Sequence, residues 1–113
     1  MAAGRHLVGL GSTEVHDYRI RFSAVDPEPL ATHAALRLVA ALEDMPGPAR
    51  VGQARQDDAA RRVEAEFVIV VRHGMADAAR DGSRLAKEGL KAANMPDATL
   101  LELNVLRESA PEP

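Results

Sequence analysis

The sequence predicts an α+β domain of the ferredoxin-like class, a sandwich in which two helices cover one face of a four-stranded antiparallel sheet. Three observations support this prediction. Between Val15 and Arg107 the apolar residues switch between strand-like alternation and helical periodicity in the order β-α-β-β-α-β. Segments rich in proline, glycine or aspartate separate these stretches, and the length of 113 residues suits one domain. The expected strand order is 4-1-3-2, which makes the first and third strands central neighbours.

The first strand and the first helix follow each other in the N-terminal half of the chain. Val15–Val25 alternates between apolar and polar residues, which is typical of a strand with one buried face. Asp26 is expected to cap a helix and Pro27 to be its first residue, so the helix is predicted from Pro27 to Asp44. The side chains expected to be buried are Tyr18, Ile20, Phe22 and Ala24 of the strand, and Leu30, Ala34, Leu38, Ala41, Leu42 and Met45 of the helix.

The middle of the chain predicts a hairpin. Arg50–Gln56 is a weak strand, expected at the sheet edge, where its Arg and Gln side chains disfavour pairing with other chains. Asp57–Ala60 is the expected turn, and Arg61–Val71 is the strongest strand. Its final part, Phe67–Val71, is apolar on both faces. That pattern predicts a central strand whose end is covered on both sides.

A second helix and a last strand complete the pattern. Met75–Asn94 has one apolar face, on which Gly82 and Gly89 are expected to allow close approach of the backbone to the sheet or to a partner. Thr99–Arg107 is the predicted last strand. Its inward-facing side chains are expected to be Leu101, Leu103 and Val105, and its outward-facing ones Leu100, Glu102, Asn104 and Leu106.

The single domain is expected to span residues 15–107. Residues 1–14 are Gly-rich and are predicted to form a flexible leader, and residues 108–113 are predicted to form a polar tail. The sequence has no cysteine, no export signal and no apolar stretch long enough for a membrane span. These features favour a cytoplasmic protein that does not insert into a membrane.

Charge and residue chemistry argue against several function classes. The net charge of −3 lacks the basic surplus of a nucleic-acid-binding protein, and the expected open sheet positions hold no aromatic residue for stacking on RNA bases. The four histidines have no helical metal-ligand spacing and no carboxylate pattern that completes a metal triad. We therefore expect no nucleic-acid partner, no metal, no cofactor and no catalytic set, and we favour a binding function over an enzymatic one.

One motif carries a possible catalytic residue: the strand-to-helix stretch Val70–Asp77, which contains Arg72, His73 and Gly74. It resembles the first motif of the histidine phosphatase family. That resemblance implies His73 as the nucleophile that takes up a phosphoryl group and Arg72 as a phosphate ligand. The family also requires a second histidine further along, and no histidine follows Gly74. The match is therefore interpreted as a coincidence, and no family is assigned.

The sheet end near His16 and His73 is the candidate binding site. Antiparallel pairing of the first and third strands is expected to bring the two histidines together, with Arg72 and Tyr18 beside them. Two histidines in ordinary hydrogen bonds at the rim would explain this arrangement without a function. The alternative is an acid/base or anion-binding site.

The sheet face opposite the helices is predicted to carry charges of both signs together with apolar residues. Cross-strand ion pairs on a solvated sheet explain such a face. So does a self-complementary surface that forms a homodimer, and so does a site for a charged small molecule. The apolar positions expected there are Val68, Val70, Leu100 and Leu106, among Asp17, Arg19, Arg21, Arg62, Glu64, Glu66, Glu102 and Asn104.

These observations together predict a small cytoplasmic module that acts by self-association, as a homodimer through the open sheet face, or through a protein partner. One alternative is a regulatory domain that binds a small anionic metabolite. Another is a dimeric α/β-barrel-type enzyme that uses His16 or His73. A closed polar cavity would favour the two alternatives, and a dry, filled core would favour the self-associating module.

Overall fold

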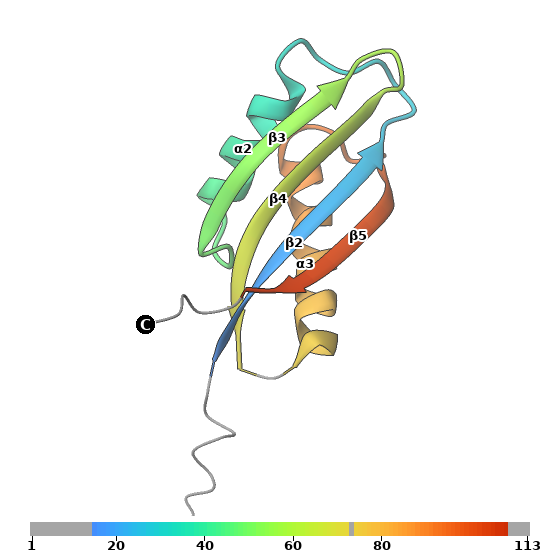
Figure 1. The fold of residues 1–113 in the computed structure, drawn as a ribbon. Helices are drawn as coiled ribbons and strands as arrows, with labels where there is room; N and C mark the ends of the chain where they lie inside the picture. The colour runs from blue at the N-terminus through green and yellow to red at the C-terminus, as the bar shows by residue number, and fades with distance from the viewer. Residues whose placement is uncertain (1–14, 73, 109–113) are drawn as a thin grey trace, which may run out of the picture.

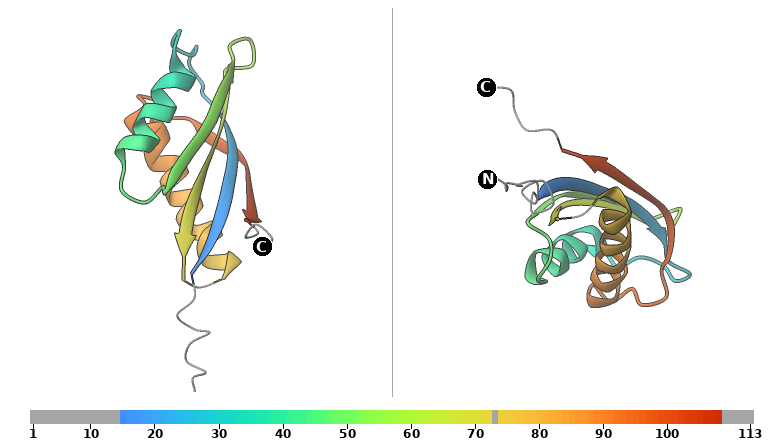
Figure 2. Two further views of the ribbon diagram at one scale, coloured as in Figure 1. Left: turned by 60° about the vertical axis from the view of Figure 1, so that its left-hand side comes forward. Right: turned by 90° about the horizontal axis from the view of Figure 1, so that it is seen from below.

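The computed structural model describes residues 15–72 and 74–108. Both helices lie on one face of the sheet and leave the other face open (Figure 1, Figure 2). The predicted α+β class and the predicted order of elements are confirmed. The predicted leader and residues 109–113 of the predicted tail lie outside the described residues. The elements are β2 (His16–Val25), α2 (Ala34–Asp44), β3 (Arg50–Asp57), β4 (Arg62–Val71), α3 (Met75–Ala92) and β5 (Thr99–Arg107).

Neighbouring strands of the sheet are antiparallel, in the order β3-β4-β2-β5. This is the predicted order read from the opposite edge, because β2 and β4 are the first and third strands of the pattern. The central pair stays in register over its whole length, from His16 opposite Val71 to Val25 opposite Arg62. The weak strand predicted from the sequence, β3, lies at an edge.

The core lies between the sheet and the two helices. Phe22 of β2 and Phe67 of β4 contact each other edge to face, with their ring centroids 6.1 Å apart. Because these are the only two phenylalanines in the sequence, smaller aliphatic side chains fill most of the layer around them. The most deeply buried large side chains are Phe67, Ile20, Leu38, Leu42 and Val63.

α3 packs close to the sheet and to α2 because its buried face carries two glycines. A Cβ atom on Gly82 would lie 2.8 Å from Ile20 Cδ1, and one on Gly89 would lie 2.7 Å from Leu42 Cδ2. Both distances are well below the optimal separation of two carbon atoms. The glycines therefore allow the close approach predicted from the sequence, although each lowers helix propensity by about 1 kcal/mol relative to alanine.

The first helix begins at Ala34 and not at Pro27, so the predicted helix start is wrong. Asp26 does not cap a helix, because its Oδ1 accepts a hydrogen bond from the Glu28 N–H (3.0 Å) in a turn that follows β2. Glu28 also precedes Pro29, and a residue before proline is disfavoured in the helical conformation. Pro27, which suggested the helix start, therefore belongs with Pro29 to the connection before the helix.

A side chain from β3 helps to define where α2 begins. Gln56 Oε1 accepts a hydrogen bond from the Ala35 N–H (2.7 Å), and Gln56 Nε2 donates to the Ala31 carbonyl (3.1 Å). The first bond satisfies a backbone N–H that the first turn of a helix leaves without an intrahelical partner, and the second holds the turn just before the helix. The cap comes from a strand that is distant in sequence, so the local pattern does not reveal it.

A β-bulge in β5 reverses two predicted side-chain orientations. Ser23 lies opposite Glu102 and Ala24 lies opposite Leu100, so Leu101 is an extra residue between these pairs. The prediction that Leu101 faces inward and Leu100 outward is wrong, because Leu100 packs against the core and Leu101 is half exposed. After the bulge, the strand keeps the predicted alternation.

Candidate functional site

The open face of the sheet, opposite the helices, carries linked ion pairs between arginines and carboxylates. The mixed charge predicted for this face is confirmed. Arg50 and Arg55 of β3, and Glu108 after β5, also lie on this face, where they were not predicted. We call the set the open-face network; its members are Asp17, Arg19, Arg21, Arg50, Arg55, Arg62, Glu64, Glu66, Glu102 and Glu108.

The open-face network consists of two groups of ion pairs: Arg19 is central to one, and Arg55, Glu64, Arg62 and Glu102 form the other. Arg19 Nε and Nη2 donate to the two carboxylate oxygens of Glu108 (2.9 and 3.2 Å), and its Nη1 donates to Glu66 Oε2 (3.1 Å). Arg21 Nε donates to the other oxygen of Glu66 (3.1 Å). The hydrogen bonds from Arg19 lower the pKa of Glu108, and the same contact raises the pKa of Arg19. The Glu108 N–H also donates to the Asp17 carbonyl (2.9 Å), which continues the pairing of β5 with β2.

Val68 lies under this network. Its side chain points to the open face, yet it is only 2% exposed. In the sheet register it lies between Arg19 of β2 and Arg50 of β3. Both arginines pair with Glu108, Arg50 through Nη2 at 3.6 Å from Oε1, so their aliphatic stems and the carboxylate cover the valine. Val68 therefore lies on the predicted face, and its burial agrees with the prediction that the end of this strand is covered on both sides.

Val70 and Leu106 are exposed apolar side chains at positions predicted for the open face. Val70 of β4 is 45% exposed and Leu106 of β5 is 46% exposed, so the cover predicted on both sides of Phe67–Val71 does not extend to Val70. The third predicted position, Leu100, packs against the core because of the bulge in β5. Single exposed apolar side chains are ordinary on a protein surface. These two side chains, however, lie on the face of the sheet that neither helix covers (Figure 2).

A shallow hollow of about 470 Å³ lies in the middle of the open face. Ser23 is almost fully buried in it, and Arg62 Nη2 donates to Ser23 Oγ (3.4 Å). On the β3 side, Gly52 and Gln53 lie opposite the single residue Glu66, and a Cβ atom on Gly52 would lie 2.6 Å from Glu66 Cγ. Charges of both signs therefore surround a polar surface that is open to solvent. The lining residues are Arg21, Phe22, Ser23, Gln53, Arg55, Glu64, Ala65, Glu66, Glu102 and Asn104.

The sheet end predicted as a binding site is assembled only in part. His16 lies opposite Val71 in the register of β2 and β4, so the exposed Arg72 belongs to the same sheet end. Tyr18 is buried in the core and does not face the surface at this end. His73 lies outside the described residues.

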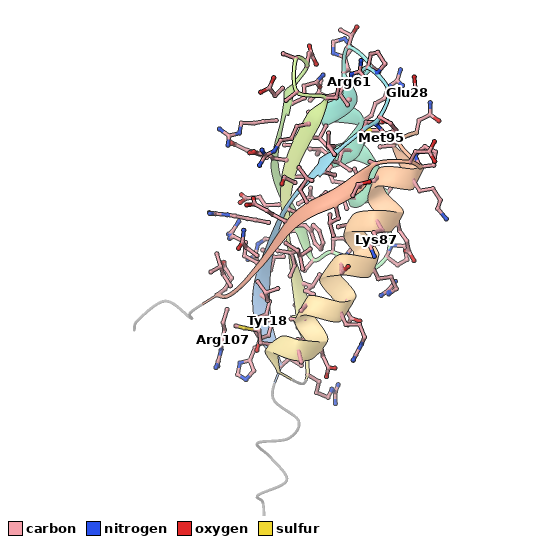
Figure 3. The ribbon with its side chains drawn as sticks, turned by 90° about the vertical axis from the view of Figure 1, so that its right-hand side faces the viewer. Tyr18, Glu28, Arg61, Lys87, Met95 and Arg107 are labelled. Atoms are coloured by element: carbon pink, nitrogen blue, oxygen red, sulfur yellow. The ribbon has the colours of Figure 1, made fainter. Side chains whose placement is uncertain are left out.

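Arg107 is the residue at this sheet end that the sequence analysis missed. It lies opposite Tyr18 in the register of β2 and β5, and Figure 3 shows both residues at the same end of the molecule. Its Nη2 is 2.8 Å from His16 Nδ1, and the imidazole nitrogen is the acceptor because a guanidinium only donates. Antiparallel pairing of the first and last strands was the signal that could have identified it.

Neither a metal centre among the described residues nor a match to a known family helps to identify the function of these sites. Within residues 15–72 and 74–108, no group of three or more His, Asp or Glu side chains is arranged to hold a metal ion. No helix in these two ranges is both long and apolar enough to cross a membrane. No protein-family model matches the chain, and no curated protein matches it. The functional inference therefore depends on the open face and on the sheet end at His16.

Proposed function

We propose that this chain is a cytoplasmic module of the ferredoxin-like class that forms a homodimer through the open face of its sheet. The observation that carries the proposal is the uncovered face itself, which combines the exposed Val70 and Leu106 with the open-face network. The order of the elements and the order of the strands support the ferredoxin-like class.

The core favours a binding module over an enzyme. Among the described side chains, the buried Ser23 and Asp26 lie outside the cluster between the helices and the sheet, and Tyr18 supplies the one hydroxyl within it. A barrel-type enzyme would need polar groups that converge in a cavity between these layers. The ionisable side chains that pair with one another lie instead at the surface, on the open face.

The charge pattern favours a second copy of the chain over a uniformly charged partner. Each arginine of the open-face network is paired with a carboxylate of the same chain. A nucleic acid or a strongly acidic or basic protein would therefore meet repulsive groups as well as attractive ones. A second copy offers the same mixture of charges, and the choice of symmetry axis decides which of them meet.

The size of the open face is suitable for a homodimer. Four strands about 4.8 Å apart, each with about eight residues that rise about 3.3 Å, make a face of about 500 Å² in projection. Protruding side chains raise the accessible area above this projected area. Standard complexes bury about 800 Å² on each partner, so association through the whole face is of the required order.

Sedimentation velocity across micromolar concentrations tests the proposal. The native chain is expected to sediment as a dimer. Val70→Glu is expected to weaken dimerisation about 100-fold or more, because it would bury a carboxylate without a partner. The matched control is Leu36→Glu on the outer side of α2, where Leu36 is 67% exposed. This control is expected to sediment like the native chain.

Two results would contradict the homodimer. One is a native chain that stays monomeric at every concentration. The other is a dimer that Leu36→Glu dissociates and Val70→Glu does not, which would assign the interface to the helix layer. Circular dichroism of each variant verifies that a loss of dimer is not a loss of fold.

The second candidate function is binding of a small anion at the sheet end, and a specific observation favours it. Within the described residues, neither Arg72 nor Arg107 has an ion-pair partner, and both belong to the end where His16 lies. Arginines without carboxylate partners are suited to phosphate or carboxylate groups.

A thermal-shift titration with inorganic phosphate and with citrate tests the anion site. A rise in the melting temperature of the native chain, reduced in Arg107→Gln and in Arg72→Gln, supports it. Equal shifts in the native chain and in both variants would assign the effect to general salt stabilisation and would remove this candidate.

A further inference from the structure

We propose that the two copies pack face to face about a two-fold axis that runs parallel to the strands, between β2 and β4, so that Arg55 of one copy pairs with Glu102 of the partner subunit. This inference rests on the proposed homodimer and specifies its geometry. It follows from the arrangement of charges in rows across the open face.

Two rows of side chains that neighbour one another across the strands cross the centre of the open face. In the first row, Ser23 of β2 lies between Glu64 of β4 and Glu102 of β5, and Glu64 lies next to Arg55 of β3. We call it the Glu64 row. From the β3 edge to the β5 edge it reads basic, acidic, neutral, acidic.

The second row, one step along the strands, is the Glu66 row. Arg21 of β2 lies between Glu66 of β4 and Asn104 of β5. On the β3 edge, Glu66 faces the bulge that contains Gln53. From the β3 edge this row reads neutral, acidic, basic, neutral.

A two-fold axis parallel to the strands reverses each row, because it lays β3 of one copy over β5 of the other. In the Glu64 row, Arg55 then faces Glu102 of the partner subunit, and this contact occurs twice. In the Glu66 row, Glu66 faces Arg21 of the partner subunit. Both rows are therefore complementary to their own reversed copies, which an isologous interface requires.

The other in-plane axis, perpendicular to the strands, brings like charges together. It keeps β3 over β3 and exchanges rows along the strands. Centred on the Glu66 row, it places Arg50 over Arg55 of the partner subunit, because these two residues lie on either side of that row. Centred between the two rows, it places Glu64 over Glu66. Like charges in contact are strongly unfavourable at an interface, so the charge pattern selects the parallel axis.

The exposure of the two key side chains fits this arrangement. Arg55 is 81% exposed and Glu102 is 65% exposed, and they lie on opposite edges of the open face. Among residues 15–72 and 74–108, the ion-pair contact of Glu102 is a long one, 3.8 Å from Arg62 Nη2. Packed sheets lie about 10 Å apart, a gap that an arginine and a glutamate bridge from opposite sides. Because packed sheets are rotated by about 30°, the match is expected in the central rows and not at the strand ends.

The experiment uses charge reversal at the two positions. Arg55→Glu and Glu102→Arg are each expected to weaken homodimerisation about 100-fold, since each creates two like-charge contacts per dimer. An equimolar mixture of the two variants is expected to form a heterodimer of native affinity. In it, the two substituted side chains face each other, and so do the native Arg55 and Glu102. The double variant is expected to recover the homodimer for the same reason.

Lys87→Glu is the matched control, since Lys87 is an exposed charge on α3, in the layer opposite the open face (Figure 3). It is expected to keep the native dissociation constant. If circular dichroism shows that a reversed variant does not fold, Arg55→Gln and Glu102→Gln replace the pair. Each is then expected to weaken the dimer about 10-fold, and their combination is expected to weaken it no further.

The results separate this inference from the proposed homodimer. If the native chain is a dimer that Val70→Glu dissociates, but both charge reversals keep the native affinity, the axis is wrong and the homodimer stands. If both reversals dissociate the dimer and their mixture stays monomeric, the pairing of positions 55 and 102 is wrong. A strictly monomeric native chain overturns the homodimer and the axis together.

Discussion

The two faces of the sheet are formed by the same strands but are stabilised by different forces. On the helix-covered face, apolar side chains such as Ile20 and Phe67 are fully buried. On the open face, partly exposed arginines and carboxylates form ion pairs. Burying a large apolar side chain contributes about 1.5–3 kcal/mol, whereas an exposed ion pair contributes less than about 1 kcal/mol. The comparison indicates that one face holds the fold together, while the composition of the other is available to specify a partner.

β4 shows this contrast between neighbouring residues. Phe67 points to the helices and Val68 to the open face, and both are almost fully buried. Phe67 is covered by other apolar side chains, and Val68 by the stems of two arginines that share one carboxylate. Charged side chains can therefore shield an apolar position from water without forming a core.

The largest effect is expected from Phe67→Ala. Removing this ring from the helix-covered face deletes its contact with Phe22 and leaves a cavity, so the free energy of unfolding is expected to fall by about 3–5 kcal/mol. Val70→Ala, on the open face of the same strand, is the control, and at concentrations where the chain is monomeric it is expected to change this free energy by less than about 1 kcal/mol. Urea unfolding followed by circular dichroism measures both. Similar losses for the two variants would mean that the open face is as important for stability as the core.

Replacing a glycine by alanine is expected to have an intermediate effect on the free energy of unfolding, and the effect is expected to differ between the two faces. Gly82→Ala improves helix propensity by about 1 kcal/mol, but overpacking against the buried Ile20 costs about 1–3 kcal/mol. The net loss is expected to be on the order of 1 kcal/mol. Gly52→Ala meets Glu66, a partly exposed side chain that can turn away, so the loss is expected to be smaller, below about 1 kcal/mol.

The double variant Ile20→Val with Gly82→Ala sharpens this comparison. The shorter valine lacks the Cδ1 atom that lies 2.8 Å from the position of the new Cβ. Gly82→Ala is therefore expected to be less destabilising in the Ile20→Val background than in the native chain. A double-mutant cycle from urea unfolding gives the coupling. Additive losses would show that the Cδ1 atom of Ile20 does not limit the approach of α3.

The smallest effect is expected from the Glu108 contact. The folded chain lowers the pKa of Glu108 below its ordinary value of 4.5, mainly through hydrogen bonds from Arg19. A lowered carboxyl pKa stabilises the fold above that ordinary value, and the contribution is lost as the pH falls through the pKa of the folded state. The urea midpoint of the native chain is therefore expected to fall more steeply below pH 4.5 than that of Glu108→Gln. Parallel pH profiles would contradict a specific role of this contact.

The periodicity of the chain predicted most of the fold because each strand has one dominant apolar face. In β2 the alternation runs without interruption, and the four side chains predicted to face inward, Tyr18, Ile20, Phe22 and Ala24, are buried. In β5 the alternation predicted the faces only after the bulge at Leu101, because one extra residue reverses every side chain on one side of it. No local signal in Thr99–Arg107 marks that bulge.

The candidate sites were less predictable because they depend on long polar side chains. The pairing of β2 and β4 predicted that His16 and Arg72 belong to one sheet end, and the register confirms this. The partner of His16, Arg107, comes from a third strand. The cover over Val68 requires Glu108, a residue that the sequence pattern assigns to a polar tail.

By itself, the sequence determined which face of each element is apolar, because hydrophobic periodicity is a property of consecutive residues. Only the tertiary structure decided which polar side chains meet. Gln56 reaches α2 across 21 positions, Arg19 reaches Glu108 across 89, and Arg107 reaches His16 across 91. Such contacts depend on strand register and on bulges, which the packing of the whole sheet sets. The sequence therefore predicted the helix-covered face in outline, and the structure was needed to place the charges of the open face.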